Sequence, residues 1–345
     1  MNNFKKIGLS ALAGSLAMAS AAHAVDASVS MESQVVFSSA EGNQADTAKN
    51  GKGISTDNDL AFNASGELDM GWTVSVAHVL DTNDNVTNSS TQMAIGMGSL
   101  GTVQINQSGG ASTNAIDDVL PKAYEETWDP GIGTASFHTF GSALNNGSVS
   151  YKTPAVELPF GVTASATFDY DPNSGQNAPA TSGVGLDAAS AEGFTVKLAH
   201  ESGLTLGGGA ESTGNTAAGK GAKNATGYAL YSNGGLSVGY QEFYANAAIV
   251  EQAPATTTRG VDSEGEGFAI AYTTGDISFS YSKSNETTLA NGATAALEEE
   301  EFSAIQAAYN MGGMTIAASL YEADNLDGVA AKKYEETELS VSFAF

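Results

Sequence analysis

The sequence predicts an all-β protein, a transmembrane antiparallel up-and-down β-barrel of about sixteen strands. Three observations predict this fold. Apolar and small polar residues alternate along most of the chain, the connections between the alternating runs are short and long in turn, and an export signal precedes them. Lipid excludes open sheet edges, because unpaired backbone groups find no water there, so the sheet is expected to close on itself.

The chain opens with the features of a cleaved export signal. Two lysines precede the apolar core Ile7–Ala19, and Ala22-His23-Ala24 matches the A-x-A pattern of a signal-peptidase site. A core of about 13 residues is too short to span a bilayer, and the alternative is a short buried helix. We therefore expect residues 1–24 to be removed and residues 25–345 to form a single outer-membrane barrel domain.

Composition excludes several other classes of protein. Hydrophobic residues make up 41% of the chain, which excludes an acidic disordered protein. The signal carries two of the 13 basic side chains and none of the 39 acidic ones, so the mature net charge is −28 rather than −26. Such a charge excludes a nucleic-acid partner. The chain has no cysteine, which excludes disulfides and thiolate metal sites, and no cofactor or metal is expected.

The alternating runs have one large apolar face and one small polar face. In Ile277–Ser282 every odd position is apolar and every even position is serine, and Val162–Phe168 alternates in a similar way. The inward positions of a soluble sandwich are bulky because they fill a core, whereas the polar face here suits a strand that lines water. The runs begin near Ala27, Asp59, Trp72, Thr91, Thr102, Ser148, Gly161, Gly193, Leu204, Thr226, Leu236, Gly267, Ile277, Glu301, Thr315 and Glu335.

Connections of two lengths join these runs in turn. The short ones are Asp69–Gly71, Gly98–Leu100, Pro154–Pro159, Ser202–Gly203, Asn233–Gly235, Thr274–Asp276 and Met311–Gly313. The long polar ones include Ser39–Asn58, Ser108–Gly147, Asp171–Glu192 and Ala245–Glu264. Short periplasmic turns and long external loops are typical of bacterial outer-membrane barrels.

The last run also has the form of a barrel strand. Leu339, Val341, Phe343 and Phe345 share one face, and small residues occupy the other. The alternative is an ordinary edge strand. A terminal aromatic strand resembles the C-terminus of outer-membrane barrels. This resemblance implies that Phe343 and Phe345 take part in closing the barrel and in recognition by the barrel-insertion machinery.

Several stretches resemble the sixteen-stranded general porins of Gram-negative bacteria, especially the marine alphaproteobacterial type. Met1–Leu9 is similar to the signal peptide of that group. Phe62–Leu68, followed by Gly71-Trp72-Thr73, is similar to its second and third strands around their first turn. Asp118-Val119-Leu120-Pro121 resembles the D-x-L-P start of the porin constriction loop, and Val149–Pro154 resembles the strand that returns from it.

The resemblance implies a passive channel for small hydrophilic solutes and ions, narrowed by a loop at residues 108–147 that folds into the lumen. It also implies a homotrimer, surrounded by outer-membrane lipid and lipopolysaccharide. The wall of such porins carries arginines opposite the acidic loop, but Asp59 and Gln92 stand at two of these positions here. Lys122 replaces an acid after the D-x-L-P motif, and Glu126 keeps a later acidic position.

The remaining charges predict a preference for cations. Alternation puts Lys152 and Lys197 on the lumen-facing side of their strands, where they could oppose the acids of the loop. These acids are Asp117, Asp118, Glu125, Glu126 and Asp129. Rings of acidic side chains concentrate cations, whereas the one arginine, Arg259, falls in a long external loop. The alternative is that the loop acids face solvent outside the channel.

His78 and Gln107 are polar residues on the lipid-facing side of the third and fifth predicted strands. A subunit contact would relieve the cost of polar groups in lipid, but both residues lie near strand ends, where headgroup water suffices. The homotrimer is therefore expected from the family resemblance.

Three further patterns suggest other chemistry. Asp169–Gly175 has the D-x-D-x-N spacing of calcium loops but lacks their central glycine and final glutamate, so a polar turn is expected. Glu298–Glu301 could meet lipopolysaccharide-bound divalent cations or could form a solvated loop. His78, His138 and His200 lie in no catalytic motif of the sequence, and the protein is not expected to be an enzyme.

The predicted function is passive diffusion of small hydrophilic solutes and ions, with a preference for cations. One alternative is a substrate-selective porin for a solute class that the sequence does not identify. Another is a non-conducting barrel that serves as an adhesin or surface anchor through its long acidic loops. A hydrolase in the outer membrane would need a convergent set of residues, which the sequence lacks.

Overall fold

The computed structural model describes residues 26–42, 50–83, 85–127, 144, 147–172, 190–214, 219–246, 249–252, 256–259, 262–289 and 297–345. The main sheet consists of β1 (Asp26–Gly42), β2 (Gly51–Glu67), β3 (Thr73–Asp81), β4 (Thr87–Gly96), β5 (Thr102–Gln107), β6 (Ser148–Lys152), β7 (Val156–Leu158), β8 (Val162–Asp171), β9 (Ala191–His200), β10 (Leu204–Thr213), β12 (Lys223–Asn233), β13 (Leu236–Asn246), β16 (Asp262–Thr274), β17 (Ile277–Leu289), β18 (Glu300–Asn310), β19 (Met314–Asp324) and β20 (Tyr334–Ala344). Because β6 and β7 both pair with β8, the 17 strands occupy sixteen positions.

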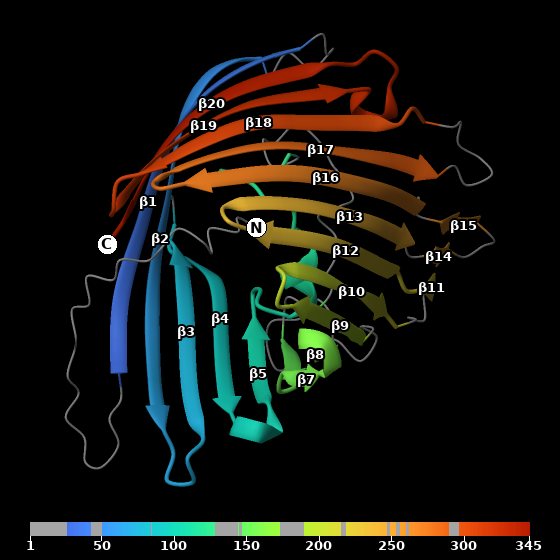
Figure 1. The fold of residues 1–345 in the computed structure, drawn as a ribbon. Coiled ribbons are helices and arrows are strands. Elements are labelled where there is room, and N and C mark those ends of the chain that lie inside the picture. The colour runs from blue at the N-terminus through green and yellow to red at the C-terminus, as the bar shows by residue number, and fades with distance from the viewer. Residues whose placement is uncertain are drawn as a thin grey trace.

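The sheet closes on itself where the last strand pairs with the first. Glu32–Gly42 of β1 runs antiparallel to Tyr334–Ala344 of β20. Beyond this ladder, Met31 and Phe345 exchange two backbone hydrogen bonds, of 3.0 and 2.9 Å. Figure 1 shows the seam, with the blue first strands beside the red last ones. The predicted closed antiparallel barrel is therefore confirmed.

The strand starts predicted from alternation agree with the structure, except near the long loops. The predicted loop Ser39–Asn58 is wrong at both ends, because β1 continues to Gly42 and β2 begins at Gly51. These extensions pair in register, Ala40 with Gly51 and Phe37 with Ile54. Outside the lipid band both faces of a strand can be polar, so the backbone ladder continues where the alternation fades.

The long loops contain further secondary structure. β11 (Gly219–Lys220), β14 (Ile249–Gln252) and β15 (Thr256–Arg259) form a separate three-stranded sheet, so Arg259 lies on a strand of a long connection. Short 3₁₀ turns are η2 (Gly98–Leu100), η3 (Thr113–Ile116), η6 (Pro159–Gly161) and η7 (Leu326–Gly328). No helix among the described residues is long and apolar enough to cross a membrane.

The two faces of the barrel wall differ as the alternation predicts. On β20, Ser340 and Ser342 are 1% and 6% exposed, whereas Leu339 on the opposite face is 45% exposed. Large apolar side chains such as Phe168 and Phe279 are exposed in the same way on other strands. This apolar outer face is the one that lipid covers, and the small polar side chains line the inside.

Apolar clusters lie on the inner side of the wall. Phe302 and Tyr334 belong to one cluster, which joins β18 to β20. Ile116 packs against Tyr228 in another, so a residue of η3 contacts the wall strand β12. The interior is therefore partly filled by the chain segment that follows β5.

The turn between β9 and β10 requires glycine at position 203. Gly203 has a φ of +94°, and a Cβ at this position would lie 2.0 Å from the carbonyl oxygen of Ser232. Gly203→Ala is therefore expected to destabilise the barrel by about 1–3 kcal/mol. The urea midpoint of unfolding, followed by the electrophoretic mobility of unheated samples, measures this effect.

Gly227→Ala on β12 is the matched control, because a Cβ there meets nothing within 4 Å. Its stability is expected to stay within about 0.5 kcal/mol of the unsubstituted protein. Equal midpoints for the two variants would contradict the close approach at Gly203.

Candidate pore constriction

A segment of the chain folds against the inner wall directly after β5. Residues 108–127, the inner segment, begin the loop that the sequence predicts to narrow the channel. The backbone N–H groups of Ser112 and Thr113 donate to the carboxylate of Asp169 on β8, at 3.2 and 2.9 Å. Ser150 Oγ on β6 donates to the same carboxylate. This buried acid therefore fixes the start of η3 on the wall.

The middle of the inner segment is held by Gln241 on β13. Gln241 Oε1 accepts a hydrogen bond from Val119 N at 3.3 Å, and its Nε2 donates to Ile116 O at 2.8 Å. The same Nε2 also donates to Thr226 Oγ1 on β12, at 2.9 Å. Both ends of this wall amide are used by the main chain of the segment.

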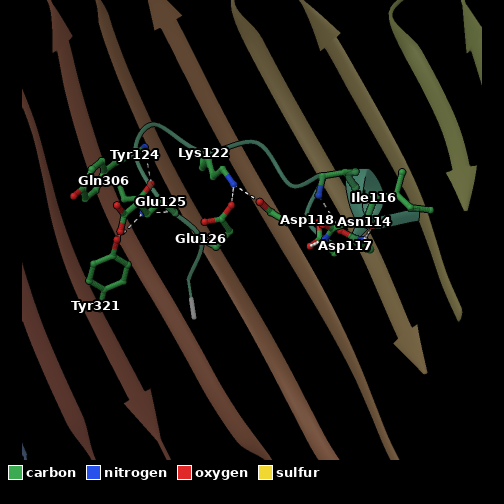
Figure 2. A network of polar contacts seen from close by, with 12 residues as sticks. Asn114, Ile116, Asp117, Asp118, Lys122, Tyr124, Glu125, Glu126, Gln306 and Tyr321 are labelled. Atoms are coloured by element: carbon green, nitrogen blue, oxygen red, sulfur yellow. Dashed lines mark hydrogen bonds and ion pairs between the residues drawn. The ribbon is translucent and has the colours of Figure 1, made fainter. Parts of the chain in front are cut away.

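The far end of the inner segment is held by β17 and β18. Gln306 Oε1 accepts from Tyr124 N at 3.0 Å, and Gln306 Nε2 donates to Glu125 O at 2.5 Å. Ser280 Oγ accepts from Ala123 N at 2.9 Å. Figure 2 shows the segment crossing the inner wall, from Ile116 at one end to Tyr124 beside Gln306 at the other.

Wall glycines make room for the apolar side chains of the segment. A Cβ at Gly267 would lie 2.6 Å from Leu120 Cδ1, and one at Gly239 would lie 2.6 Å from Pro121 Cδ. Leu120 is 6% exposed. Larger wall residues at these two positions would push the segment away from the wall.

The charges of the inner segment partly neutralise one another. Lys122 Nζ forms ion pairs with Asp118 and Glu126, which stand four residues before and after it. The two carboxylate side chains are 6% and 8% exposed, and the lysine side chain is 21% exposed (Figure 2). Lys122 therefore masks two of the acids that the sequence assigns to the constriction.

Asp117 is a buried acid of the same segment. Asn114 Nδ2 donates to Asp117 Oδ2 at 2.8 Å, while Asp117 Oδ1 is buried and has no hydrogen-bond partner among the described residues. Burial, and to a smaller extent the neighbouring Asp118, raise the pKa of Asp117 to about 7, while Lys122 acts in the opposite direction. Asp117 therefore changes its charge near neutral pH.

A row of acids lies on the inner wall of the first three strands. Asp59 on β2 pairs in register with Glu32 on β1 and with Asp81 on β3, so the three side chains share the inner face. Asp57 lies on the same face of β2 and accepts from Asn83 Nδ2 at 2.7 Å. Each of these acids is half-buried. The sequence identified Asp59 but missed its three neighbours, because their convergence depends on strand register.

The acidic row lies on the part of the wall between the two ends of the inner segment. The segment starts near β4, where a Cβ at Gly110 would meet the side chain of Gln92. It passes β8, β13 and β18 and reaches β1, where Gln34 Nε2 donates to Tyr124 OH at 3.1 Å. The stretch from β1 to β3 completes this circuit, and it carries the acidic row.

The other predicted site residues lie as follows. Lys152 is on the inner face of β6, where its Nζ donates to Gln104 Oε1 at 2.8 Å. Lys197 shares the inner face of β9 with the buried Thr195, and it is exposed. Glu125 is part of the inner segment, and its carbonyl oxygen binds Gln306. Asp129 lies outside the described residues.

A family model described as Gram-negative porin matches residues 8–345. The chain belongs to the Gram-negative porin family. This protein is therefore an outer-membrane porin, a transmembrane channel in its family and in its barrel fold. No match is found among curated proteins.

Solved porin structures share the fold at low sequence identity. Salmonella typhi OmpF in complex with daunomycin has a TM-score of 0.65 at 13% identity, over 92% of this chain and 98% of that one. An anion-selective porin from Comamonas acidovorans has a TM-score of 0.63 at 12% identity, over 94% and 100%. The trimer form of OmpT from Vibrio cholerae gives 0.63 at 11%, over 92% and 99%. These likenesses extend over nearly the whole porin chain.

The expected polar turn at Asp169–Gly175 begins later than predicted. Asp169 and Asp171 are buried on the last residues of β8, and Asp169 binds the inner segment, as described above. The described residues contain no group of three or more His, Cys, Asp or Glu side chains arranged to hold a metal ion.

The acidic run Glu298–Glu301 runs into β18, where Glu301 pairs with Lys283 Nζ at 2.7 Å. His78 Nδ1 lies 2.6 Å from Thr91 Oγ1 on the neighbouring strand. His200 Nδ1 lies 2.7 Å from Ser202 Oγ in the exposed turn after β9. His138 lies outside the described residues.

The aromatic residues at the end of the porin chain stack on each other. The ring centroids of Phe343 and Phe345 are 6.3 Å apart, and the planes differ by 11°. Phe345 is 54% exposed, and its backbone pairs with Met31. Both aromatic residues therefore stand at the seam of the barrel.

The raised pKa of Asp117 predicts that the seating of the inner segment depends on pH. The folded porin keeps this proton to about pH 7, whereas the unfolded chain loses it near pH 4. The docking of the inner segment on the wall is therefore most stable in acid, and its stability falls as the pH rises from about 4 to about 7. Open-channel current noise is expected to be larger at about pH 8 than at about pH 5.

Asp117→Asn removes the titrating group at nearly constant size. The current noise of this variant is expected to be equal at the two pH values. Equal current noise at about pH 5 and about pH 8 in the unsubstituted porin would contradict the role of Asp117.

Proposed function

We propose that this porin is a passive, cation-preferring diffusion channel for small hydrophilic solutes, narrowed by the loop at residues 108–147. The inner segment supports the constriction because its main chain bonds to the inward side chains of four wall strands, β8, β13, β17 and β18. Asp117, Asp118, Lys122, Glu125 and Glu126 then line or support the narrow part, together with Asp59, Gln92, Lys152 and Lys197 on the wall. The porin performs no chemical reaction in this proposal.

The acidic row Glu32, Asp57, Asp59 and Asp81 is the observation that carries the cation preference. Lys122 is engaged by two carboxylates of its own segment, so it adds little positive charge to the lumen. Acidic groups around a narrow lumen raise the local concentration of cations and lower that of anions. A wall row and an acidic segment of the same sign both act in this direction.

Two rivals differ in what they need from the lumen. A sugar-selective porin needs a run of exposed aromatic side chains there. Among the described residues, the inward Tyr228, Phe302, Tyr321 and Tyr334 are buried, and Tyr124 and Phe243 are partly buried. A non-conducting adhesin or surface anchor predicts a folded, inserted barrel without current. Stepwise currents in a planar bilayer would support the channel, and their absence from inserted protein would favour the adhesin.

The wall acids are tested by the reversal potential under a KCl gradient. In the double variant Asp59→Asn with Asp81→Asn, the K⁺/Cl⁻ permeability ratio is expected to fall about twofold or more at about 0.1 M salt, where fixed charges act over about 10 Å. The difference is expected to fade at about 1 M salt, where the Debye length is about 3 Å.

Glu335→Gln is the matched control, since it removes one acid from the outward face of β20. Its permeability ratio is expected to equal that of the unsubstituted porin. An anion preference of the unsubstituted porin, or an unchanged ratio in the double variant, would overturn the cation proposal.

We propose that residues 1–24 direct export and that residues 25–345 form one barrel domain. The stacked Phe343 and Phe345 at the seam support a role of this strand in closure and in recognition by the barrel-insertion machinery. The apolar outward face supports the proposal that outer-membrane lipid surrounds the barrel, with lipopolysaccharide at the rim that carries the long loops.

We further propose a homotrimer. The solved structure of OmpT from Vibrio cholerae is a trimer form, and the two chains share the barrel fold. His78 already has a hydrogen-bond partner in its own chain, Thr91, so it does not need a neighbouring subunit. His78→Leu is therefore expected to leave the trimer intact, as measured by light scattering in detergent. Dissociation of this variant to monomers would contradict that assignment of the histidine.

A further inference from the structure

We infer that Gln241 and Gln306 are the positioning residues of the constriction, and that they set its place by holding the main chain of the inner segment. This inference rests on the proposed channel function, which it deepens. It concerns two wall residues that carry no charge and lie on strands far from the segment in the sequence.

Gln241 binds the segment at two points that are three residues apart in the sequence. Its amide oxygen binds Val119 N and its amide nitrogen binds Ile116 O, while Thr226 Oγ1 takes a further hydrogen bond from the nitrogen. The side chain is 0% exposed. A buried amide is costly unless its polar atoms are bonded, so Gln241 and the segment stabilise each other when docked.

Gln306 repeats this arrangement at the other end. Its oxygen binds Tyr124 N and its nitrogen binds Glu125 O, and Ser280 Oγ donates to the same oxygen at 3.1 Å. Gln306 is 2% exposed. Glutamine is suited to this role, since one planar group offers both an acceptor and a donor to the backbone of the segment.

The two amides bracket the apolar contact of the segment. Gln241 holds residues 116–119 and Gln306 holds residues 124–125, while Leu120 packs between them against Gly267. Close packing leaves the backbone little freedom at this point. The amides bind backbone atoms, so the path of the segment is set by the wall and not by the acidic side chains that the segment carries.

The experiment measures whether the two amides keep the segment on the wall. The chain has no cysteine, so Leu120→Cys introduces a single thiol at a position where the leucine is 6% exposed. The rate of its reaction with a charged methanethiosulfonate reagent is measured in the folded porin. Gln241→Met and Gln306→Met are then added separately, since methionine keeps the length of glutamine but forms no comparable hydrogen bonds.

Each methionine variant is expected to raise the labelling rate about tenfold or more, as the loss of two hydrogen bonds to the segment allows it to leave the wall more often. Gln107→Met is the matched control, because Gln107 lies at the end of β5 outside the segment. Its rate is expected to equal that of the Leu120→Cys parent. Retained electrophoretic mobility of unheated samples verifies that all barrels are folded.

A labelling rate that stays unchanged in both folded methionine variants would overturn the inference, as would an equal rise in the Gln107 control. The same variants are examined in bilayers, where wider or noisier currents are expected for Gln241→Met and Gln306→Met. A parent porin without current would overturn the proposed channel, whereas the labelling rates would still decide whether the amides hold the segment. The two failures are therefore distinguishable.

Discussion

The structure depends on one constraint, that every backbone polar group in the lipid layer needs a partner within the chain. An antiparallel sheet meets this constraint when it closes, and the pairing of β20 with β1 provides the closure. Closure fixes an inside and an outside, so alternate residues of each strand must suit lipid and water in turn. The exposed Leu339 beside the buried Ser340 is the local form of this requirement.

The same constraint acts again inside the barrel. A chain segment that leaves the wall and docks within the lumen loses water from part of its backbone, and that backbone needs new partners. Here the partners are wall side chains, the carboxylate of Asp169 and the amides of Gln241 and Gln306. The small residues of the inner wall, such as Gly267, leave room for the docked chain. The inner wall therefore both lines the pore and binds the inner segment.

Most of the fold could be predicted from the sequence, because lipid imposes a short period on each strand and the C-terminal strand carries it to Phe345. The extensions of β1 and β2 could not, since polar residues on both faces leave no period. In the candidate site, Asp118, Lys122 and Glu126 could be found because residues 118–121 resemble the D-x-L-P start of the porin constriction loop. Glu32 and Asp81 join Asp59 through strand register, and Gln241 meets Val119 across more than a hundred residues. Such contacts exist only once the barrel has closed.

The acids on the wall differ from the charge arrangement that the family resemblance implies, in which wall arginines face an acidic loop. Opposite charges on a wall and a loop attract, so they can hold a loop in place and create a transverse field. Asp59 on the wall and the acids of the segment carry charges of the same sign, so these groups supply no attraction that could hold the segment. The backbone of the segment is held instead by the carboxylate of Asp169 and by two buried, uncharged amides, Gln241 and Gln306. In the proposed channel, loop position and ion preference therefore depend on different residues, although one set of charges could serve both.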